Sequence, residues 1–429
     1  MVERITPNRL GIVGESDSIS IQNAVNYAKK TGVNQIVIPR KNFRTGKTVW
    51  IIDQAILLPS DMTVILDNCH LRLKDGAFCN IFRNENMYTE KSLTLAGEQN
   101  NINIIGKGYA VLDGGKTNFM LECNYKTFEC VDKKEGLRVN NLVLLHNVNG
   151  FRLENFEVRD QRWWAINCIY CQNGHISDII SDADNYVPNQ DGINLRLGCN
   201  NVLVERISGV SGDDLVALTY LATNDAFAVK GKEPHLHDVV VRDVIGTSAK
   251  QGMVVIRNQD YIEAHDVKIE NVIHSNRGNN NFKGYVSVRV GQNGYFREFE
   301  SKMGSTRNIT VKNVVGSTST TIMVGATLKD CKFENIRADG GYWVFLSQGV
   351  KMQDVEIDGL YYEQRFFEKQ AGAYGIIEDT NPFSPNGYMR EEDYIKNLTV
   401  KNYVNVSGEE KVYLNPNIEN EVYLEGEKL

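Results

Sequence analysis

The most regular feature of the chain is an eight-residue pattern of apolar and polar positions that recurs nine times. In nearly every copy the third, fifth and eighth residues are apolar and the fourth is polar, which is strand alternation followed by a bend. The seventh residue is Asn or Asp in eight of the nine copies, with Arg206 as the exception. Such short side chains suit a turn because they bond to neighbouring backbone groups. The copies begin at Asn149, Gln172, Asn200, His237, His265, Arg307, Lys329, Gln348 and Lys396.

The spacing of the copies predicts how the strands are arranged. Successive copies start 23, 28, 37, 28, 42, 22, 19 and 48 residues apart, which suggests a unit of about 22–28 residues. We expect the longest gap to hold two units and the intermediate gaps to carry loops. Short strands at this period, with no helices between them, are typical of stacked β-coils, whereas a propeller blade or a sandwich fits less well. The sequence therefore predicts an all-β fold, namely a single-stranded parallel β-helix that forms one domain over residues 1–429.

Both ends of such a stack need protection, because an open coil exposes unpaired backbone and apolar interior. Residues 1–45 are expected to form the N-terminal cap, with a helix over "SISIQNAVNYAKK" that has Ser18 as its N-cap. The strand "NQIVIPR" follows it. Residues 364–394 break the pattern and are expected to be a loop insertion beside the stack. The apolar face of the expected helix comprises Ile21, Ala24, Val25 and Ala28.

Composition narrows the class of protein. The chain of 429 residues is 42% hydrophobic and 24% charged, as in soluble globular proteins, and no apolar run approaches the roughly 18 residues that cross a membrane. A net charge of −7 argues against nucleic acid as a partner. The N-terminus lacks a basic start and an apolar core, so no signal peptide is expected. The expected compartment is the cytoplasm by default, or a secreted or periplasmic location if a leader was removed.

Eight cysteines are present, and Cys168 and Cys171 form a CxxC motif. No second pair follows at the spacing of a zinc site. Buried free thiols are therefore the favoured interpretation, with a disulfide or a metal site as the alternatives.

Three acids stand out among strand-like residues. Asp191 and Asp213 lie 22 residues apart, and Asp214 follows directly. Residues one period apart should lie nearly above one another on coils separated by about 4.8 Å. Clustered carboxylates repel one another, so at least one pKa should rise, and the cluster favours acid–base chemistry. Ordinary turn residues and a calcium site are the alternatives.

These motifs resemble those of the polygalacturonase-like glycoside hydrolases of family 28, which are right-handed parallel β-helices of the pectin-lyase type. That family carries N-T-D-G on one coil and D-D on the next. It also carries S-P-x-W about two dozen residues upstream, which "RDQRWWAINCIYCQNG" resembles. The matching residues are Asn189, Asp191 and Gly192, then Asp213 and Asp214, with Trp163 and Trp164 upstream.

Two motifs of the family are altered in this chain. The G-H-G motif expected after D-D is absent, and R-I-K is replaced by "GMVVIRNQD", where Arg257 is the only basic residue that can stand in. In polygalacturonases these basic residues contact the carboxylate of the substrate. The resemblance therefore implies that hydrolysis is retained on a sugar other than plain polygalacturonate.

The resemblance also implies roles for the acids. Asp213 would be the general acid, and Asp191 and Asp214 would activate water from the opposite side, without metal or cofactor. An inverting mechanism of this kind needs its carboxyl groups about 6.5–9.5 Å apart. The residues expected to hold the carbohydrate are Asn189, Tyr186, Arg196, Tyr220, Arg257, Tyr261 and Arg289.

Two other functions remain compatible with the sequence. One is a polysaccharide lyase of the same fold, although no Lys/Arg cluster is evident beside the acids. The other is a non-catalytic glycan-binding or tailspike-like β-helix, because fold does not fix function. In each case the expected partner is a carbohydrate rather than nucleic acid or membrane, and the protein is expected to be a monomer or a trimer.

Overall fold

The computed structural model describes residues 4–77, 79–115, 141–185, 189–220, 227–249, 251–258, 262–275, 286–291, 302–325, 327–339, 343–348, 351–363, 376–379, 394–406, 412–414 and 419–429. By its internal contacts the chain divides into two compact units. Unit 1 comprises Met1–Asp213 and Asp225–Glu233, and unit 2 comprises Asp214–Asn224 and Pro234–Leu429.

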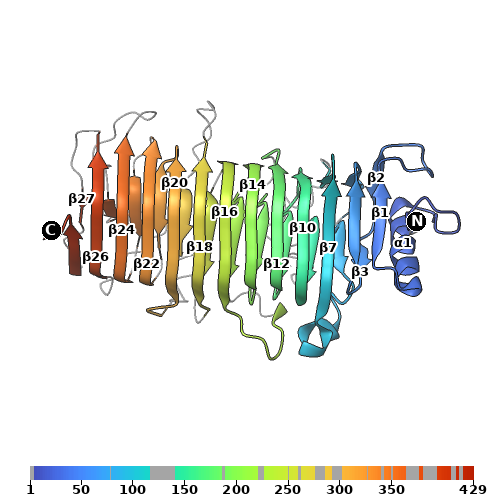
Figure 1. The fold of residues 1–429 in the computed structure, drawn as a ribbon, viewed down its shortest axis with the longest axis horizontal. Helices are drawn as coiled ribbons and strands as arrows, with labels where there is room; N and C mark the ends of the chain where they lie inside the picture. Colours follow the sequence, from blue (N-terminus) through green and yellow to red (C-terminus); the bar gives the residue numbers. More distant parts are fainter. Residues whose placement is uncertain are drawn as a thin grey trace. The chain divides into compact units, whose positions relative to one another are not determined.

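Unit 1 is a stack of parallel coils that begins with a helix (Figure 1). In its first coils β1 pairs with β4, β4 with β7, β2 with β5 and β5 with β8. From β10 onward each coil has one long strand and one short strand. The helices of unit 1 are α1 (Asp17–Thr31), η1 (Glu90–Leu93) and η2 (Leu95–Gly97). Its strands are β1 (Gln35–Pro39), β2 (Val49–Ile52), β3 (Ile56–Leu58), β4 (Thr63–Asp67), β5 (His70–Leu73), β6 (Phe82–Asn84), β7 (Gln99–Lys107), β8 (Val111–Asp113), β9 (Val143–His146), β10 (Val148–Arg159), β11 (Ile166–Ile169), β12 (Gln172–Asp182), β13 (Ile193–Arg196) and β14 (Asn200–Ser211).

Unit 2 is built in the same way. Its long strands pair in parallel in the order β16, β18, β20, β22, β24, β26 and β28, and its short strands in the order β15, β17, β19, β21, β23, β25 and β27. The short β29 pairs antiparallel with β28. The bounds are β15 (Val216–Tyr220), β16 (Leu236–Ser248), β17 (Gly252–Asn258), β18 (Ala264–His274), β19 (Val286–Val290), β20 (Thr306–Gly316), β21 (Thr320–Val324), β22 (Leu328–Asp339), β23 (Trp343–Gln348), β24 (Lys351–Glu363), β25 (Ile376–Asp379), β26 (Tyr394–Asn405), β27 (Val412–Tyr413), β28 (Glu419–Leu424) and β29 (Glu427–Lys428). Parallel ladders of this kind confirm the predicted β-helix.

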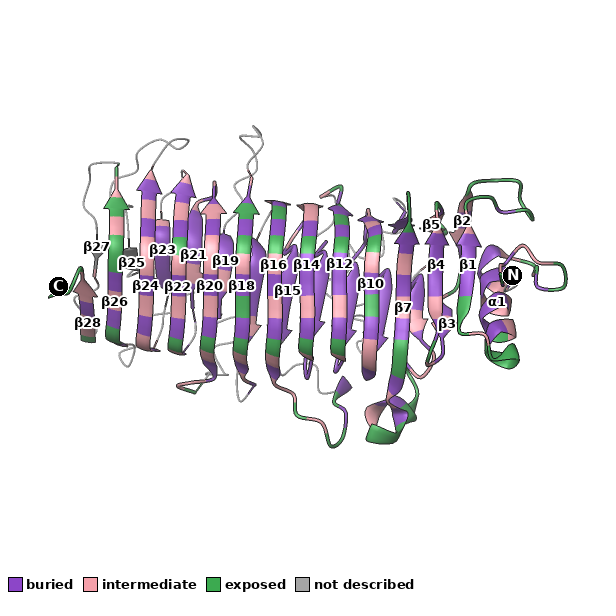
Figure 2. Cartoon of the chain, viewed as in Figure 1, coloured by how far each residue is buried: buried purple, intermediate pink, exposed green. Residues whose placement is uncertain are grey.

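The eight-residue pattern corresponds to the long strands, and its apolar positions point inward. In the copy that begins at His265, the third, fifth and eighth residues are Val267, Ile269 and Val272, and all three are fully buried. Figure 2 shows this alternation as buried bands across the long strands. Each stacked coil therefore adds its apolar side chains to the interior of its unit.

The seventh residue forms a bend, as predicted, in the eight copies that the structure keeps in register. These eight residues have positive φ, between 53° and 60°, a left-handed conformation that Asn and Asp tolerate better than most residues. Their side chains also form ladders from coil to coil, as when Asn313 donates to Asn271 over 2.9 Å and Asn335 donates to Asn313 over 3.0 Å. At Arg206 the guanidinium contacts Asp178 of the preceding coil instead.

One copy of the pattern was placed in the wrong register. The structure aligns Lys329 with Gln353, five residues after the predicted start at Gln348, so the copy reads "QDVEIDGL" and Gly359 forms its bend. The error in the predicted register has a physical cause. The second residue of most copies is also a left-handed Asn or Asp, such as Asp354 at φ 54°, and it lies five residues before the bend.

The prediction that the longest gap holds two units was also wrong. The long strand β24 pairs directly with β26, so no further long strand lies between them in the ladder. Residues 376–379, within the expected insertion 364–394, form β25, which pairs with β23 and β27. Apart from these and Tyr394, the first residue of β26, the expected insertion lies outside the described residues.

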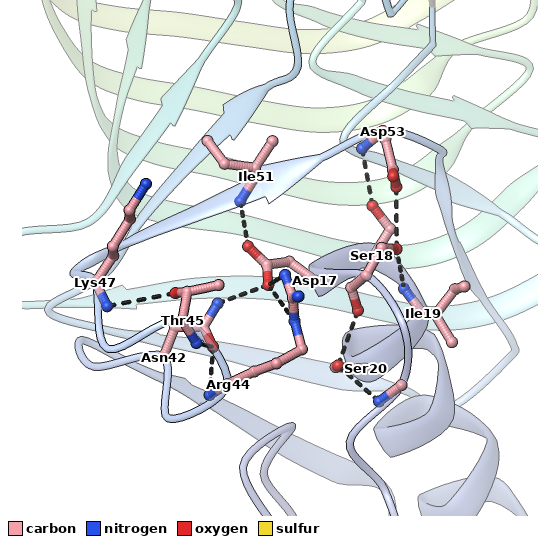
Figure 3. Close-up of polar contacts among 12 residues, drawn as sticks. Asp17, Ser18, Ile19, Ser20, Asn42, Arg44, Thr45, Lys47, Ile51 and Asp53 are labelled. Carbon is pink, nitrogen blue, oxygen red and sulfur yellow. Dashed lines mark hydrogen bonds and ion pairs between the residues drawn. The ribbon is translucent and has the colours of Figure 1, made fainter.

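The helix α1 starts earlier than the sequence suggested. Its N-cap is Ser16, whose hydroxyl accepts a hydrogen bond from the Ile19 N–H at 3.3 Å, so the expected N-cap at Ser18 was wrong. The Ser18 hydroxyl instead accepts from the backbone N–H of Asp53 at 2.9 Å (Figure 3). The predicted apolar face was right, because Ile21, Ala24, Val25 and Ala28 are all buried.

The buried Asp17 fixes this helix to the first coils. Its carboxylate accepts hydrogen bonds from the Asn42 side chain at 2.7 Å and from the Ile51 N–H at 2.8 Å, and it pairs with Arg44 (Figure 3). A carboxylate removed from water needs such partners. The position of α1 therefore depends on the bonds of Asp17 as well as on apolar contacts.

Candidate active site

The candidate acids lie at the start of short strands. Asp191 lies two residues before β13, and Asp213 and Asp214 lie just before β15. The division between the units falls between Asp213 and Asp214, so Asp191 and Asp213 belong to unit 1 and Asp214 to unit 2.

Asp191 is almost entirely buried and is held by three neighbours. Its carboxylate accepts a hydrogen bond from the Asn194 side chain at 3.0 Å. Its backbone carbonyl accepts from the Ala165 N–H at 2.9 Å and from the Gln161 side chain at 3.1 Å. The position of this acid is therefore fixed from both its side chain and its backbone.

Asp191 and Asp213 occupy equivalent positions on neighbouring coils. The Gly212 N–H donates to the Gln190 carbonyl at 3.0 Å, and each of these residues directly precedes one of the two acids. The strands that flank them, β12 and β14, are parallel neighbours. The backbone register around the two acids thus follows the 22-residue offset seen in the sequence.

Asn189 begins the turn that carries Asp191. It has a left-handed backbone with φ 59°, a conformation in which Asn is more common than most residues. The side chain of Asn189 is half-buried.

In unit 2, Asp214 is paired with Arg257. The two side chains approach to 3.0 Å, and only 2% of the Asp214 side chain and 14% of the Arg257 side chain are exposed. Asp214 also accepts the Gly252 N–H at 3.2 Å. Arg257 extends from β17, and its guanidinium donates to the Gln251 side chain at 3.4 Å as well.

Burial raises the pKa of the Asp214 carboxyl above its ordinary value, because the charged form loses its water. The positive charges of Arg257 and Arg289 and the Gly252 N–H act on the pKa in the opposite direction. Arg289 lies on β19, opposite Val255 of β17. The expectation that no basic cluster lies beside the acids was therefore wrong for Asp214.

Arg196, a predicted contact for substrate, packs against protein. Its guanidinium lies over the ring of Trp164, 4.3 Å from the ring centroid, and the residue is only 3% exposed. Trp163 and Trp164 lie outside the strands and their rings contact each other, with centroids 5.6 Å apart. The stacking holds Arg196 at the end of β13.

The remaining candidates are described only in part. Tyr186 and Tyr261 lie outside the described residues, and Tyr220 is placed by its backbone alone, as the last residue of β15. The cysteines among the described residues are free thiols, and Cys168 and Cys171 are both buried.

The sequence did not point to the groups that hold Asp191. Gln161, Asn194 and Gln190 are all buried polar residues. Asn194 carried a weak signal, because it lies three residues after the acid on an outward position of the strand "INLRL". The two glutamines become recognisable only when neighbouring coils are aligned.

No three His, Cys, Asp or Glu side chains of the described residues are grouped so that they could hold a metal ion. None of the helices in the described part of the chain is long and apolar enough to cross a membrane.

Residues 29–228 match the model of the family described as glycosyl hydrolases family 28. This segment of the chain is thus a glycoside hydrolase domain of family 28, as the sequence motifs implied. The matched segment includes all three acids and ends before Arg257. No curated protein matches the chain in sequence.

Solved structures resemble the whole chain in fold. The family 28 exopolygalacturonase of Yersinia enterocolitica has a TM-score of 0.56 at 13% identity, covering 100% of this chain and 79% of that protein. The polygalacturonase of Erwinia carotovora has a TM-score of 0.51 at 12% identity, covering 98% and 96%. The A-module of a mannuronan C-5 epimerase from Azotobacter vinelandii has a TM-score of 0.56 at 11% identity, covering 98% of both chains. A hydrolase and an epimerase score equally, so these likenesses show the β-helix fold and leave the reaction to the residues of the site.

Proposed function

We propose that this protein is an inverting glycoside hydrolase that cleaves an O-glycosidic bond in an oligosaccharide or polysaccharide. Asp213 protonates the glycosidic oxygen as the C–O bond breaks, while Asp191 and Asp214 take a proton from the attacking water. The observation that supports this most strongly is the hydrogen bond between Gly212 and Gln190, inside the family 28 domain, because it sets Asp191 and Asp213 in register.

The spacing of coils suits this chemistry. Neighbouring coils lie about 4.8 Å apart, and side chains that leave them at different lateral positions can reach the roughly 6.5–9.5 Å that inversion requires. Backbone and side-chain contacts hold Asp191 before substrate arrives. A fixed carboxylate needs little reorganisation when charge develops in the transition state.

The substrate we propose is a carbohydrate other than plain polygalacturonate. The family's G-H-G motif is absent from the sequence, and the R-I-K motif is reduced to Arg257. That one arginine is paired with Asp214 at 3.0 Å, so much of its charge is already balanced within the protein. The charge of Arg289 also acts on Asp214. Both arginines thus balance an acid within the protein and have less positive charge to offer to the carboxylate of a uronic acid.

The test is a screen of the purified protein against polysaccharides, including polygalacturonate, and aryl glycosides. Wild-type protein should release reducing ends from one of these substrates, and Asp213→Asn should remove that activity without changing the circular dichroism spectrum. Asp178→Asn is the matched control, because Asp178 forms an exposed bend where most other copies have Asn or Asp.

Three results would contradict the proposal. Near wild-type turnover in Asp213→Asn would exclude the assigned acid. An unsaturated product that absorbs in the ultraviolet and disappears with chelator would indicate a lyase. Glycan binding without cleavage across the panel would indicate a binding protein of the tailspike kind.

A further inference from the structure

An ion pair in unit 1 with one fully buried partner, Arg162, takes no part in the chemistry proposed above. Arg162 has no exposed side-chain surface, and its guanidinium lies 3.2 Å from the carboxylate of Asp184, whose side chain is 26% exposed. The Arg162 Nε also donates to the carbonyl of Gly115. Burying a charged guanidinium is costly, and the ion pair that accompanies it is often no more stabilising than apolar packing. Its presence here is better explained by what it holds in place.

The ion pair holds Gln190. The Gln190 side chain donates to Asp184 at 2.8 Å and to the backbone carbonyl of Gln161 at 2.8 Å. The Gln161 side chain donates in return to the carbonyl of Gln190 at 3.2 Å and to that of Asp191 at 3.1 Å. All of these residues except Asp184 are at least nine-tenths buried. We call Gln161 and Gln190, with these reciprocal bonds, the glutamine clasp.

The glutamine clasp connects the coils that carry two of the proposed acids. The Gln190 carbonyl also accepts the N–H of Gly212, the residue before Asp213. The approach is close: a Cβ on Gly212 would lie 2.8 Å from the Cβ of Gln190. A movement of Gln190 would therefore displace Asp191, which follows it in the sequence, and Gly212, which is bonded to it from the neighbouring coil.

We propose that Arg162 and Asp184 are positioning residues that act through Gln190 to set the placement of Asp191 relative to Asp213. The charged pair orients the Gln190 amide, and the amide holds the peptide units next to both acids. This inference rests on the proposed hydrolase function. It assigns a role to residues that touch neither substrate nor the reacting atoms.

Three variants separate this role from general stability. Asp184→Asn keeps the shape of the side chain but removes the charge that Arg162 requires. Gln190→Met keeps the volume and removes the amide, while the backbone carbonyl stays. Asp178→Asn is the matched control, because it alters an Asp–Arg pair of unit 1 whose partners, Asp178 and Arg206, are both exposed.

Two measurements are made on each variant. The first is hydrogen exchange at the Gly212 and Ala165 amides, which donate to Gln190 and Asp191 and report their placement without any substrate. The second is the kinetics on the substrate found in the screen. Asp184→Asn and Gln190→Met should each speed exchange at both amides and lower kcat by roughly 10- to 100-fold. KM should stay within about threefold of the wild-type value, because the variants lose an interaction that stabilises the transition state and not the bound substrate.

The double variant provides a second criterion. Asp184 and Gln190 act in one chain of contacts, so the double variant should lose little more kcat than the worse single variant. Additive losses in kcat would overturn the proposal. So would exchange and kinetics that match those of Asp178→Asn, or faster exchange at Gly212 with unchanged kcat. A wild-type protein that cleaves nothing in the screen would overturn the hydrolase function itself, a result distinct from these.

Discussion

The N–H of Gly212 donates to the carbonyl of Gln190 over 3.0 Å, and this bond joins the two coils that carry Asp191 and Asp213. Each acid directly follows one of the bonded residues. Backbone pairing alone therefore fixes the relative register of the two acids, before any contact of their own side chains. Cooperation between acids from successive coils is the basis of the proposed chemistry.

The pairing of Arg257 with Asp214 leads to a prediction about pH. Arg257 lowers the pKa of the buried Asp214 carboxyl, so Arg257→Met should raise that pKa further. If Asp214 must be ionised to help activate water, the acid limb of the kcat/KM profile then moves to higher pH. The measurement is the pH–rate profile of the variant beside that of the wild type.

Arg257→Lys is the control for this prediction, because it keeps a positive charge near Asp214. Its acid limb should lie closer to that of the wild type than the limb of Arg257→Met does. An acid limb that stays in place in Arg257→Met would show that Asp214 is not the group that titrates there.

His274 should make the stability of unit 2 depend on pH. Burial lowers its pKa from 6.5 to about 4, because the charged imidazole would lose its water. The folded state favours neutral His274, so this contribution is complete above pH 6.5 and is lost as the pH falls toward 4. The loss amounts to roughly 3 kcal/mol in the free energy of unfolding.

Denaturant unfolding of the wild type and of His274→Gln between pH 7 and pH 4 measures this effect. The variant should lose less stability over that range, since its amide does not titrate and still accepts a hydrogen bond, as His274 accepts one from the Ser248 N–H. His237→Gln, at a half-buried histidine that pairs with Asp238, is the control and should follow the wild type. Parallel curves for all three proteins would contradict the assignment to His274.

The bend residues yield a prediction about the stability of the coils. Asn313 has φ 56° and exchanges hydrogen bonds with Asn271 and Asn335. Asn313→Ala loses these bonds and also places a Cβ in the left-handed region, whereas Asn313→Gly loses only the bonds. The alanine variant should therefore be less stable than the glycine variant by about 1 kcal/mol in denaturant unfolding. Equal stabilities would mean that the backbone conformation adds nothing to the role of the side chain.

Much of this fold could be predicted from the sequence because one physical requirement recurs on every coil. Val267, Ile269 and Val272 occupy positions that must be apolar in every copy, and Asn271 occupies one that must tolerate a left-handed backbone. The same requirement caused the wrong start at Gln348, since two left-handed positions five residues apart look alike in sequence.

The supports of the site could not be predicted in this way. Whether Arg162 is buried depends on Asp184 and on the carbonyl of Gly115, which lie on other parts of the coil stack. The pairing of Arg257 with Asp214 likewise follows from the alignment of β15 with β17, which the sequence alone does not give. The spacing of acids along the chain reports register, whereas contacts between side chains depend on three-dimensional packing.

The stereochemistry of the first product tests the central claim most directly. Proton NMR during the first minutes of cleavage shows the configuration of the newly formed anomeric centre before mutarotation mixes it. If acids on neighbouring coils admit a water between them and the sugar, the product has the inverted configuration. A product that retains the configuration of the substrate would contradict this account, because retention requires carboxyl groups only about 5–5.5 Å apart and a covalent intermediate.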